Sequence, residues 1–116
     1  MRLVMPNPLT DETFAEFVRT HRFVVIHFWA AWNGVDHVMH RLLETQIPTD
    51  LREQVTFASL DIDSPAHREL CLEHKIGNVP FLAFYRDGVL TRSVTGMRTP
   101  EVITDYLREL VNEAVA

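Results

Sequence analysis

The sequence has 116 residues, of which 47% are apolar and 23% are charged, and its formal net charge is −5. This composition is typical of a globular protein with one core, so we expect one domain spanning residues 1–116. The acidic balance and the lack of a basic run argue against a nucleic-acid partner, because phosphate binding requires concentrated positive charge.

The N-terminal sequence and the cysteine count indicate a compartment. The first twenty residues lack the basic and apolar regions of a secretory signal, and no apolar run is long enough to span a membrane. We therefore expect a cytoplasmic protein with no membrane partner. The single cysteine, Cys71, cannot form an internal disulfide, which agrees with a reducing compartment.

The first half of the chain predicts two strands, each followed by a helix. A short strand at residues 3–5 ends at Pro6, and Thr10 is the expected N-cap of a helix that ends near His21. Residues 23–29 are almost all apolar and rich in β-branched and aromatic types, which is typical of a strand buried on both faces.

A turn at residues 30–34 leads into the second helix. Beyond Gly34, apolar residues recur at the spacing of one helix face: Val35, Val38, Met39, Leu42 and Leu43. Pro48 marks the end of this helix or a break in it. Residues 55–62 then predict a third strand.

The second half of the chain predicts a short helix followed by a hairpin. The helix begins at Ser64-Pro65 and runs to Lys75. Strands at residues 81–85 and 89–95 follow, and Asp87-Gly88 between them supplies the positive φ that hairpin turns need.

The last helix begins at Thr99-Pro100-Glu101, a cap, a proline and an acid in the order that favours a helix start. The complete order is β-α-β-α-β-α-β-β-α. Alternating strands and helices with a hairpin near the end predict the α/β class.

The end of the buried strand, Phe28-Trp29-Ala30-Ala31-Trp32, resembles the F-W-A-x-W segment of the thioredoxin family. The resemblance covers about residues 9–110 and implies a thioredoxin fold, with a mixed central β-sheet flanked by helices on both faces. Where that family has C-G-P-C, this chain has Asn33-Gly34-Val35-Asp36. Thiol–disulfide exchange requires a thiolate, so a disulfide oxidoreductase of the dithiol type is not expected.

Neighbouring positions also differ from the family. His27 stands where the resemblance places a buried acid, and Ser59 where it places the lysine partner of that acid. Because the whole set has changed, we interpret the chain as a naturally redox-inactive member. We expect no cofactor.

The resemblance retains a groove that binds polypeptides. Val79-Pro80 aligns with the family's cis-proline, and in the family the backbone of the preceding residue pairs with a bound polypeptide. Gly88 also aligns with a family glycine. We expect the backbone of Val79 to be free and Trp32 to be exposed. The predicted partner-binding residues are Trp32, Asn33, Gly34, Val35, Val79, Pro80 and Gly96.

Two interpretations of the altered turn remain open. In the structural one, Asn33 is the N-cap of the second helix and Asp36 interacts with the helix dipole. In the functional one, Asp36 lies next to His27, as the resemblance implies, and the two form an ion pair, a pH-responsive switch or a general base.

Six histidines raise the question of a metal site. Asp36 and His40 are four residues apart on one helix, with His37 on an adjacent face. A second set with helical spacing consists of His67, Cys71 and His74. Neither set has the four closely spaced ligands of a structural zinc site, so we predict no metal.

The leading functional hypothesis is a polypeptide-binding adaptor, chaperone-like factor or subunit that uses the groove around Trp32 and Val79-Pro80. The alternative is a monothiol oxidoreductase or redox sensor, which requires Cys71 to be exposed with a lowered pKa. Otherwise Cys71 is a small core residue. A self-associating homodimer is a third hypothesis.

Overall fold

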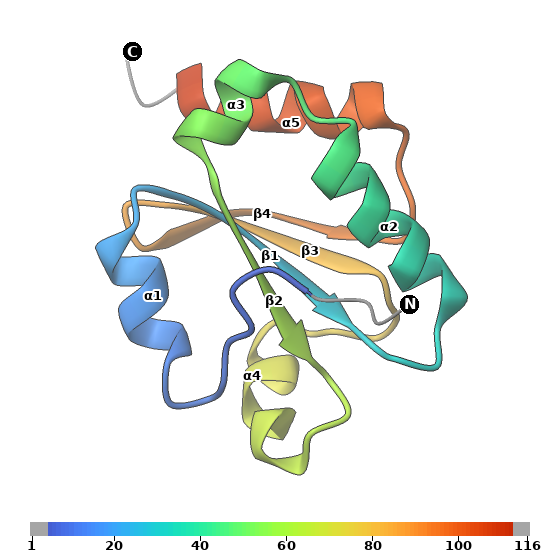
Figure 1. Cartoon of the computed structure of the whole chain (residues 1–116). Coiled ribbons are helices and arrows are strands. Elements are labelled where there is room, and N and C mark those ends of the chain that lie inside the picture. Colours follow the sequence, from blue (N-terminus) through green and yellow to red (C-terminus); the bar gives the residue numbers. More distant parts are fainter. Residues whose placement is uncertain (1–4, 113–116) are drawn as a thin grey trace.

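The computed structural model describes residues 5–112, which form a four-stranded sheet with helices on both faces (Figure 1). The strands are β1 (Phe23–Trp29), β2 (Thr56–Asp61), β3 (Phe81–Arg86) and β4 (Val89–Thr95). The helices are α1 (Phe14–Thr20), α2 (Gly34–Thr45), α3 (Thr49–Gln54), α4 (Arg68–Glu73) and α5 (Pro100–Asn112), with a 3-10 turn η1 (Pro65–His67).

The sheet has the order β2-β1-β3-β4 and is mixed. β1 pairs in parallel with β2, whereas β3 is antiparallel to both β1 and β4. The buried strand β1 therefore lies in the middle, and its C-terminal end carries the turn into α2. This arrangement confirms the predicted α/β thioredoxin fold.

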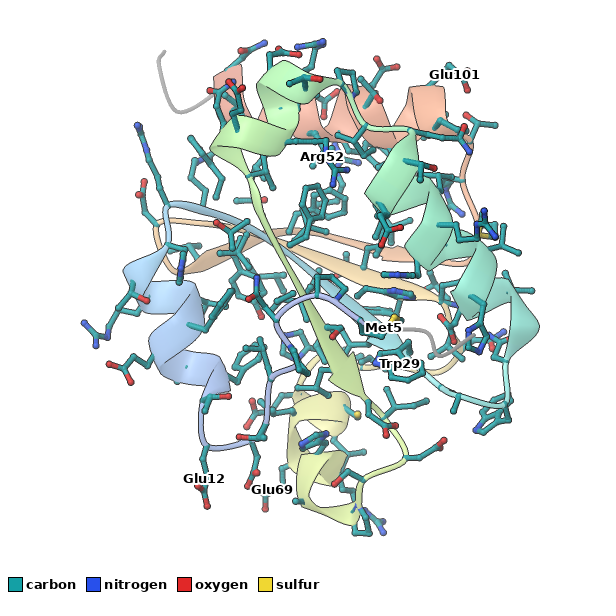
Figure 2. The ribbon with its side chains drawn as sticks, in the orientation of Figure 1. Met5, Glu12, Trp29, Arg52, Glu69 and Glu101 are labelled. Carbon is teal, nitrogen blue, oxygen red and sulfur yellow. The ribbon has the colours of Figure 1, made fainter. Side chains whose placement is uncertain are left out.

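Alternating residues of β1 pack against two separate cores. Phe23 and Val25 belong to the core beneath α2, α3 and α5, whereas Val24, Ile26 and Phe28 belong to the core beneath α1 and α4. Charged side chains such as Glu12 and Glu69 point away from the sheet (Figure 2). Because both faces of β1 are covered, its sequence is apolar at almost every position.

The N-terminal region differs from the prediction. Residues 3 and 4 of the predicted first strand lie outside the described residues, and Met5 is not in a strand. Edge pairing occurs later, where Pro8 bridges Ser59 in parallel. Thr10 does not cap a helix directly, because its hydroxyl accepts from Glu12 N at 3.2 Å in a turn that precedes α1.

The structure decides between the two alternatives left open for Pro48 and corrects one helix end. Pro48 is a break, because α2 ends at Thr45 and the six-residue helix α3 starts directly after the proline. The helix predicted to reach Lys75 ends at Glu73, and Lys75 adopts a positive φ of 56°.

The hairpin and the last helix agree with the sequence. Asp87 and Gly88 have φ values of 52° and 81°, as the turn between β3 and β4 requires. Thr99 Oγ1 accepts from Val102 N at 3.2 Å and so caps α5. Among the helices within residues 5–112, none combines the length and the apolar character needed to cross a bilayer.

Candidate functional site

The turn between β1 and α2 is fixed by the side chain of Asn33. Its backbone is extended, with φ −96° and ψ 106°, and its Oδ1 accepts from Val35 N at 3.4 Å. The predicted N-cap role is therefore confirmed. The second predicted role, contact with a partner, remains a proposal.

Asp36 lies completely buried in the first turn of α2 and accepts three hydrogen bonds. His27 Nε2 is 2.8 Å from Asp36 Oδ1, and Asp36 Oδ2 accepts from Ala30 N at 3.0 Å and from Asn33 Nδ2 at 3.1 Å. The predicted contact between His27 and Asp36 is present. Because this carboxylate joins β1, the turn and the helix cap, its geometry is that of a structural anchor.

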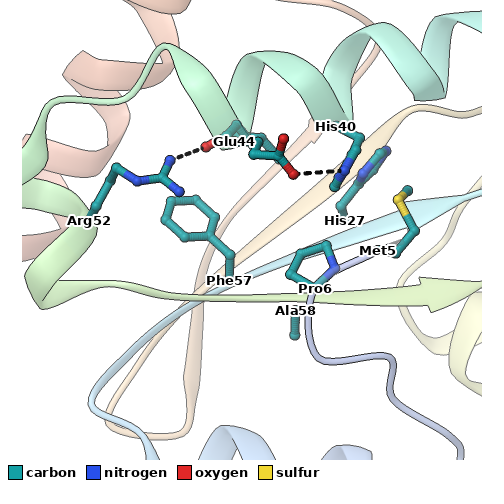
Figure 3. Close-up of a pocket in the computed structure, with 9 residues that line it drawn as sticks. Met5, Pro6, His27, His40, Glu44, Arg52, Phe57 and Ala58 are labelled. Atoms are coloured by element: carbon teal, nitrogen blue, oxygen red, sulfur yellow. Dashed lines mark hydrogen bonds and ion pairs between the residues drawn. The ribbon is translucent and has the colours of Figure 1, made fainter. Parts of the chain in front are cut away.

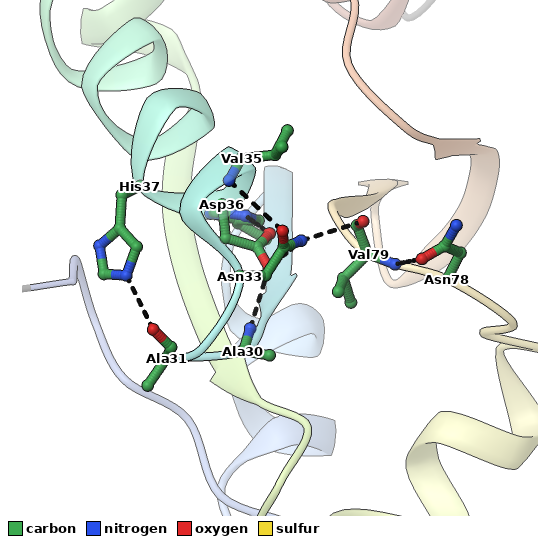
Figure 4. A network of polar contacts seen from close by, with 9 residues as sticks. Ala30, Ala31, Asn33, Val35, Asp36, His37, Asn78 and Val79 are labelled. Atoms are coloured by element: carbon green, nitrogen blue, oxygen red, sulfur yellow. Dashed lines mark hydrogen bonds and ion pairs between the residues drawn. The ribbon is translucent and has the colours of Figure 1, made fainter.

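The Val79-Pro80 peptide bond is cis and lies opposite Asn33. Figure 4 shows the Asn33 side chain pointing at the Val79 carbonyl, to which Nδ2 donates at 3.1 Å. Val79 N donates in turn to Asn78 Oδ1 at 2.9 Å. The expectation that the Val79 backbone is free is therefore wrong, since two asparagine side chains satisfy both of its polar groups.

The loop after the cis bond is tied to the end of β4. Gly96 N donates to Pro80 O at 2.8 Å, and Gly96 has a φ of 88°, which favours glycine. Pro80 is buried and Gly96 is half-buried. These two residues hold the loop in place, whereas Asn78 and Trp32 are exposed to solvent.

Exposed apolar side chains lie at the start of α2. Trp32 is 71% exposed, Val35 43% and Val38 57%. The indole Nε1 of Trp32 donates to Asp63 Oδ1 at 3.2 Å, so the ring has a preferred orientation on the surface. Gly34, at the first position of α2, is also exposed.

Ser59 does not take over the role of a charged partner for His27. It is fully buried and pairs with His27 across β1 and β2, but its hydroxyl donates to Pro6 O at 2.9 Å. Ser59 therefore secures the segment before α1.

Sequence reasoning missed a cavity of about 230 Å³ beneath α2. It is lined by Met5, Pro6, His27, His40, Leu43, Glu44, Arg52, Phe57 and Ala58 (Figure 3). His40 is 5% exposed, and its Nε2 is 3.3 Å from Glu44 Oε2. Burial lowers the pKa of His40, and Glu44 opposes this effect. The one sequence feature that could have indicated this cavity is the position of His40, which follows the buried Met39 on the inward face of α2.

Histidines of the two sets considered for a metal site contact other protein atoms. His67 Nδ1 is 2.6 Å from Asp61 O, and His37 Nε2 is 3.0 Å from Ala31 O. His74 Nδ1 is 2.8 Å from Leu70 O, and its Nε2 contacts the hydroxyl of Tyr85. Within residues 5–112, no group of three or more His, Cys, Asp or Glu residues is placed to hold a metal ion.

Cys71 lies half-buried in α4. Burial raises the pKa of its thiol, and the negative charge of Asp61 raises it further. The lowered pKa that a reactive monothiol requires is therefore contradicted.

Comparison with known proteins decides the family. The model of the thioredoxin family matches residues 5–109. The chain belongs to the thioredoxin family. Among relatives of this thioredoxin-family chain, a thioredoxin of Mycolicibacterium smegmatis is 25% identical over 103 residues, which cover 88% of each chain.

A second relative is much longer. Protein disulfide-isomerase of Saccharomyces cerevisiae is 28% identical over 110 residues, which cover 93% of this chain but only 21% of the isomerase. The thioredoxin-family chain therefore spans about a fifth of that protein.

Solved structures agree on the fold. Thioredoxin Mala s 13 of Malassezia sympodialis superposes with a TM-score of 0.76 at 23% identity, covering 94% of this chain and 96% of that one. Mitochondrial thioredoxin 3 of Saccharomyces cerevisiae gives a TM-score of 0.77 at 23% identity, covering 90% and 94%.

Proposed function

We propose that this thioredoxin-family chain binds an extended polypeptide segment and does not exchange disulfides, so that it acts as an adaptor, chaperone-like factor or subunit. The observation that carries the proposal is the environment of Asp36, which stands where the family has a cysteine. Its carboxylate is completely buried and accepts three hydrogen bonds. Such a carboxylate stabilises the turn and provides no sulfur for exchange.

The surface around the turn supports polypeptide binding. Trp32 and Val35 are exposed apolar side chains beside the turn, and exposed aromatic residues are frequent anchors of interfaces. Val79 lies opposite Asn33 in the loop next to this surface, and its two backbone groups are bonded to the side chains of Asn33 and Asn78. One relative is named a protein disulfide-isomerase, so its name includes a protein substrate. In our proposal this chain binds polypeptides but does not carry out thiol–disulfide exchange.

No observation favours the alternative monothiol function. Cys71 is half-buried, and the raised pKa of its thiol lowers the fraction of thiolate near neutral pH.

Binding is tested with a permanently unfolded probe, reduced and carboxymethylated lysozyme, by biolayer interferometry. We expect Trp32→Ala to weaken binding at least about tenfold, the effect of a hot-spot side chain. Leu72→Ala is the matched control, because Leu72 is 65% exposed on α4 and lies outside the proposed surface. Equal affinity of wild type and Trp32→Ala would discard this surface.

The absence of disulfide exchange is tested separately by the reduction of insulin with dithiothreitol. We expect the wild-type protein to leave the rate at that of dithiothreitol alone. A rate increase that depends on the protein would contradict the redox-inactive part of the proposal.

A further inference from the structure

We propose that the cavity beneath the second half of α2 binds a small neutral aromatic molecule that carries a hydroxyl group. The cavity measures about 230 Å³. Its described walls come from β1, α2, α3, β2 and the segment before α1 (Figure 3). Within residues 5–112, none of the residues that line it belongs to the surface around Trp32 and Val79, so the inference does not depend on the proposed function.

The size and the apolar part of the wall fit one aromatic ring. An apolar cavity of about 150 Å³ is large enough to bind benzene, so this larger cavity has room for a ring with a small substituent. Figure 3 shows Phe57 on one side of the cavity and Met5 on the other. Apolar side chains line most of the space between the polar groups, and a ring that packs against them removes apolar surface from water.

Two buried imidazoles form the polar part of the wall. His27 is 2% exposed and His40 is 5% exposed. In each ring Nε2 faces a carboxylate, at 2.8 Å from Asp36 Oδ1 and at 3.3 Å from Glu44 Oε2. Neither Nδ1 atom has a hydrogen-bond partner among residues 5–112.

The two Nδ1 atoms are open to the cavity. Among the described side chains, no polar atom is both sealed from solvent and without a partner, so these nitrogens reach open space. The cavity is the space that both rings line. Within the described part of the chain, each Nδ1 is therefore available to bond water or a ligand.

The state of His40 selects a hydroxyl group. A carboxylate only accepts, so Nε2 of His40 carries the proton that Glu44 binds. Burial lowers the pKa of His40, so the ring is neutral at pH 7.5 and its Nδ1 is an acceptor. A hydroxyl donates to such a nitrogen. Because it also accepts, it suits His27 in either protonation state.

The charges at the cavity favour a neutral ligand. Glu44 and Arg52 line it with opposite charges, and both already have partners. Glu44 faces His40, and Arg52 NH1 donates to Leu43 O at 2.6 Å (Figure 3). A charged ligand would lose hydration and would compete with these contacts. Glu44 and Arg52 are exposed, so they lie on the open side through which a ligand enters.

Phenol and toluene test the proposal on the unmodified protein, because toluene has a methyl group where phenol has the hydroxyl. Titrations at pH 7.5 are followed by the backbone amide shifts in NMR spectra. We expect phenol to bind saturably, to shift the amides of Leu43, Glu44 and Ala58, and to bind about fivefold more tightly than toluene, the effect of one neutral hydrogen bond. Benzoate, the charged analogue, should bind more weakly than phenol. No saturable binding of phenol at the cavity, or a preference for toluene or benzoate, would overturn the proposal.

His40→Leu assigns the preference to the imidazole, because leucine has a similar volume and no nitrogen. We expect this variant to bind toluene like wild type and phenol about fivefold more weakly than wild type does. His21→Leu, directly after α1 and outside the cavity, is the matched control and should bind both ligands like wild type. An unchanged preference for phenol in folded His40→Leu would overturn the role of His40. If the variant does not fold, the comparison of the three ligands on wild type still decides.

Discussion

His27 Nε2 lies 2.8 Å from Asp36 Oδ1, and both side chains are almost completely removed from solvent between β1 and α2. Burial of such a pair is costly unless its remaining hydrogen-bonding atoms are satisfied. Asp36 meets this condition, because Ala30 N and Asn33 Nδ2 bond its second oxygen. The pair is therefore expected to matter for stability.

We expect Asp36→Ala to reduce the free energy of unfolding by about 3–5 kcal/mol, because it removes the acceptor of the buried His27 Nε2 and Ala30 N and one of the two bonds that Asn33 Nδ2 donates. Urea denaturation followed by circular dichroism measures this change. Adding His27→Leu to Asp36→Ala should cost less than His27→Leu alone, since the pair is then already broken. A loss below about 1 kcal/mol for Asp36→Ala would contradict the structural role.

We expect stability to fall as the pH drops below about 6.5, with His40 responsible for part of the slope. Burial lowers the pKa of His40 from 6.5, and nearby His27 and His37 act in the same direction. The unfolded chain therefore takes up this proton first, so the contribution is complete above 6.5 and disappears as the pH falls through the folded pKa.

His40→Gln tests this dependence, because it removes the titrating group from the cavity. Urea denaturation at pH 7.5, 6.5 and 5.5 should give a shallower slope than in wild type. His21→Gln, at the end of α1 and not among the groups that shift the pKa of His40, is the control for a general effect of losing a histidine. Identical slopes in wild type and His40→Gln would exclude His40 as the source.

We expect Cys71 to react slowly with Ellman's reagent at pH 7.5 in the native protein. Burial and the charge of Asp61 raise the pKa of this thiol from its ordinary value, so the fraction of thiolate is reduced. Denaturation in urea should accelerate the reaction, and Asp61→Asn should accelerate it modestly. A native rate as fast as that of the denatured chain would revive the monothiol function.

We expect Gly88→Ala to destabilise the protein by about 1–2 kcal/mol, since φ at this position is 81°. Gly34→Ala is the matched control, because Gly34 begins α2 without a positive φ and a Cβ there meets nothing within 4 Å. It should be neutral or stabilising by up to about 1 kcal/mol. Thermal denaturation distinguishes the two, and equal effects would contradict the turn assignment.

The sequence predicted those features whose cause is local. Residues 23–29 form an apolar run that is typical of a strand covered on both faces. Asp87-Gly88 predicts the turn between β3 and β4, because these residue types tolerate the positive φ that the turn requires. Thr99 caps α5 for the same local reason. Helix α3 was missed because six residues are too few for a periodic pattern.

The site was predicted only in part, because its decisive contacts join distant residues. The resemblance brought His27 and Asp36 together, but nothing local in the sequence indicates that Asn33 reaches Val79, 46 residues later. The environment of Cys71 could not be predicted from the sequence either, because it depends on how α4 packs near Asp61.

The three bonds to Asp36 also limit the routes by which this chain could acquire a dithiol site. Asp36→Cys would deprive Ala30 N and His27 Nε2 of their oxygen acceptor, and Asn33→Cys would in addition remove the amide that holds Val79 O. Each step alone weakens the turn before any disulfide is gained. A dithiol site therefore requires coordinated replacement of residues in β1, the turn and α2, which makes the present state difficult to change by single substitutions.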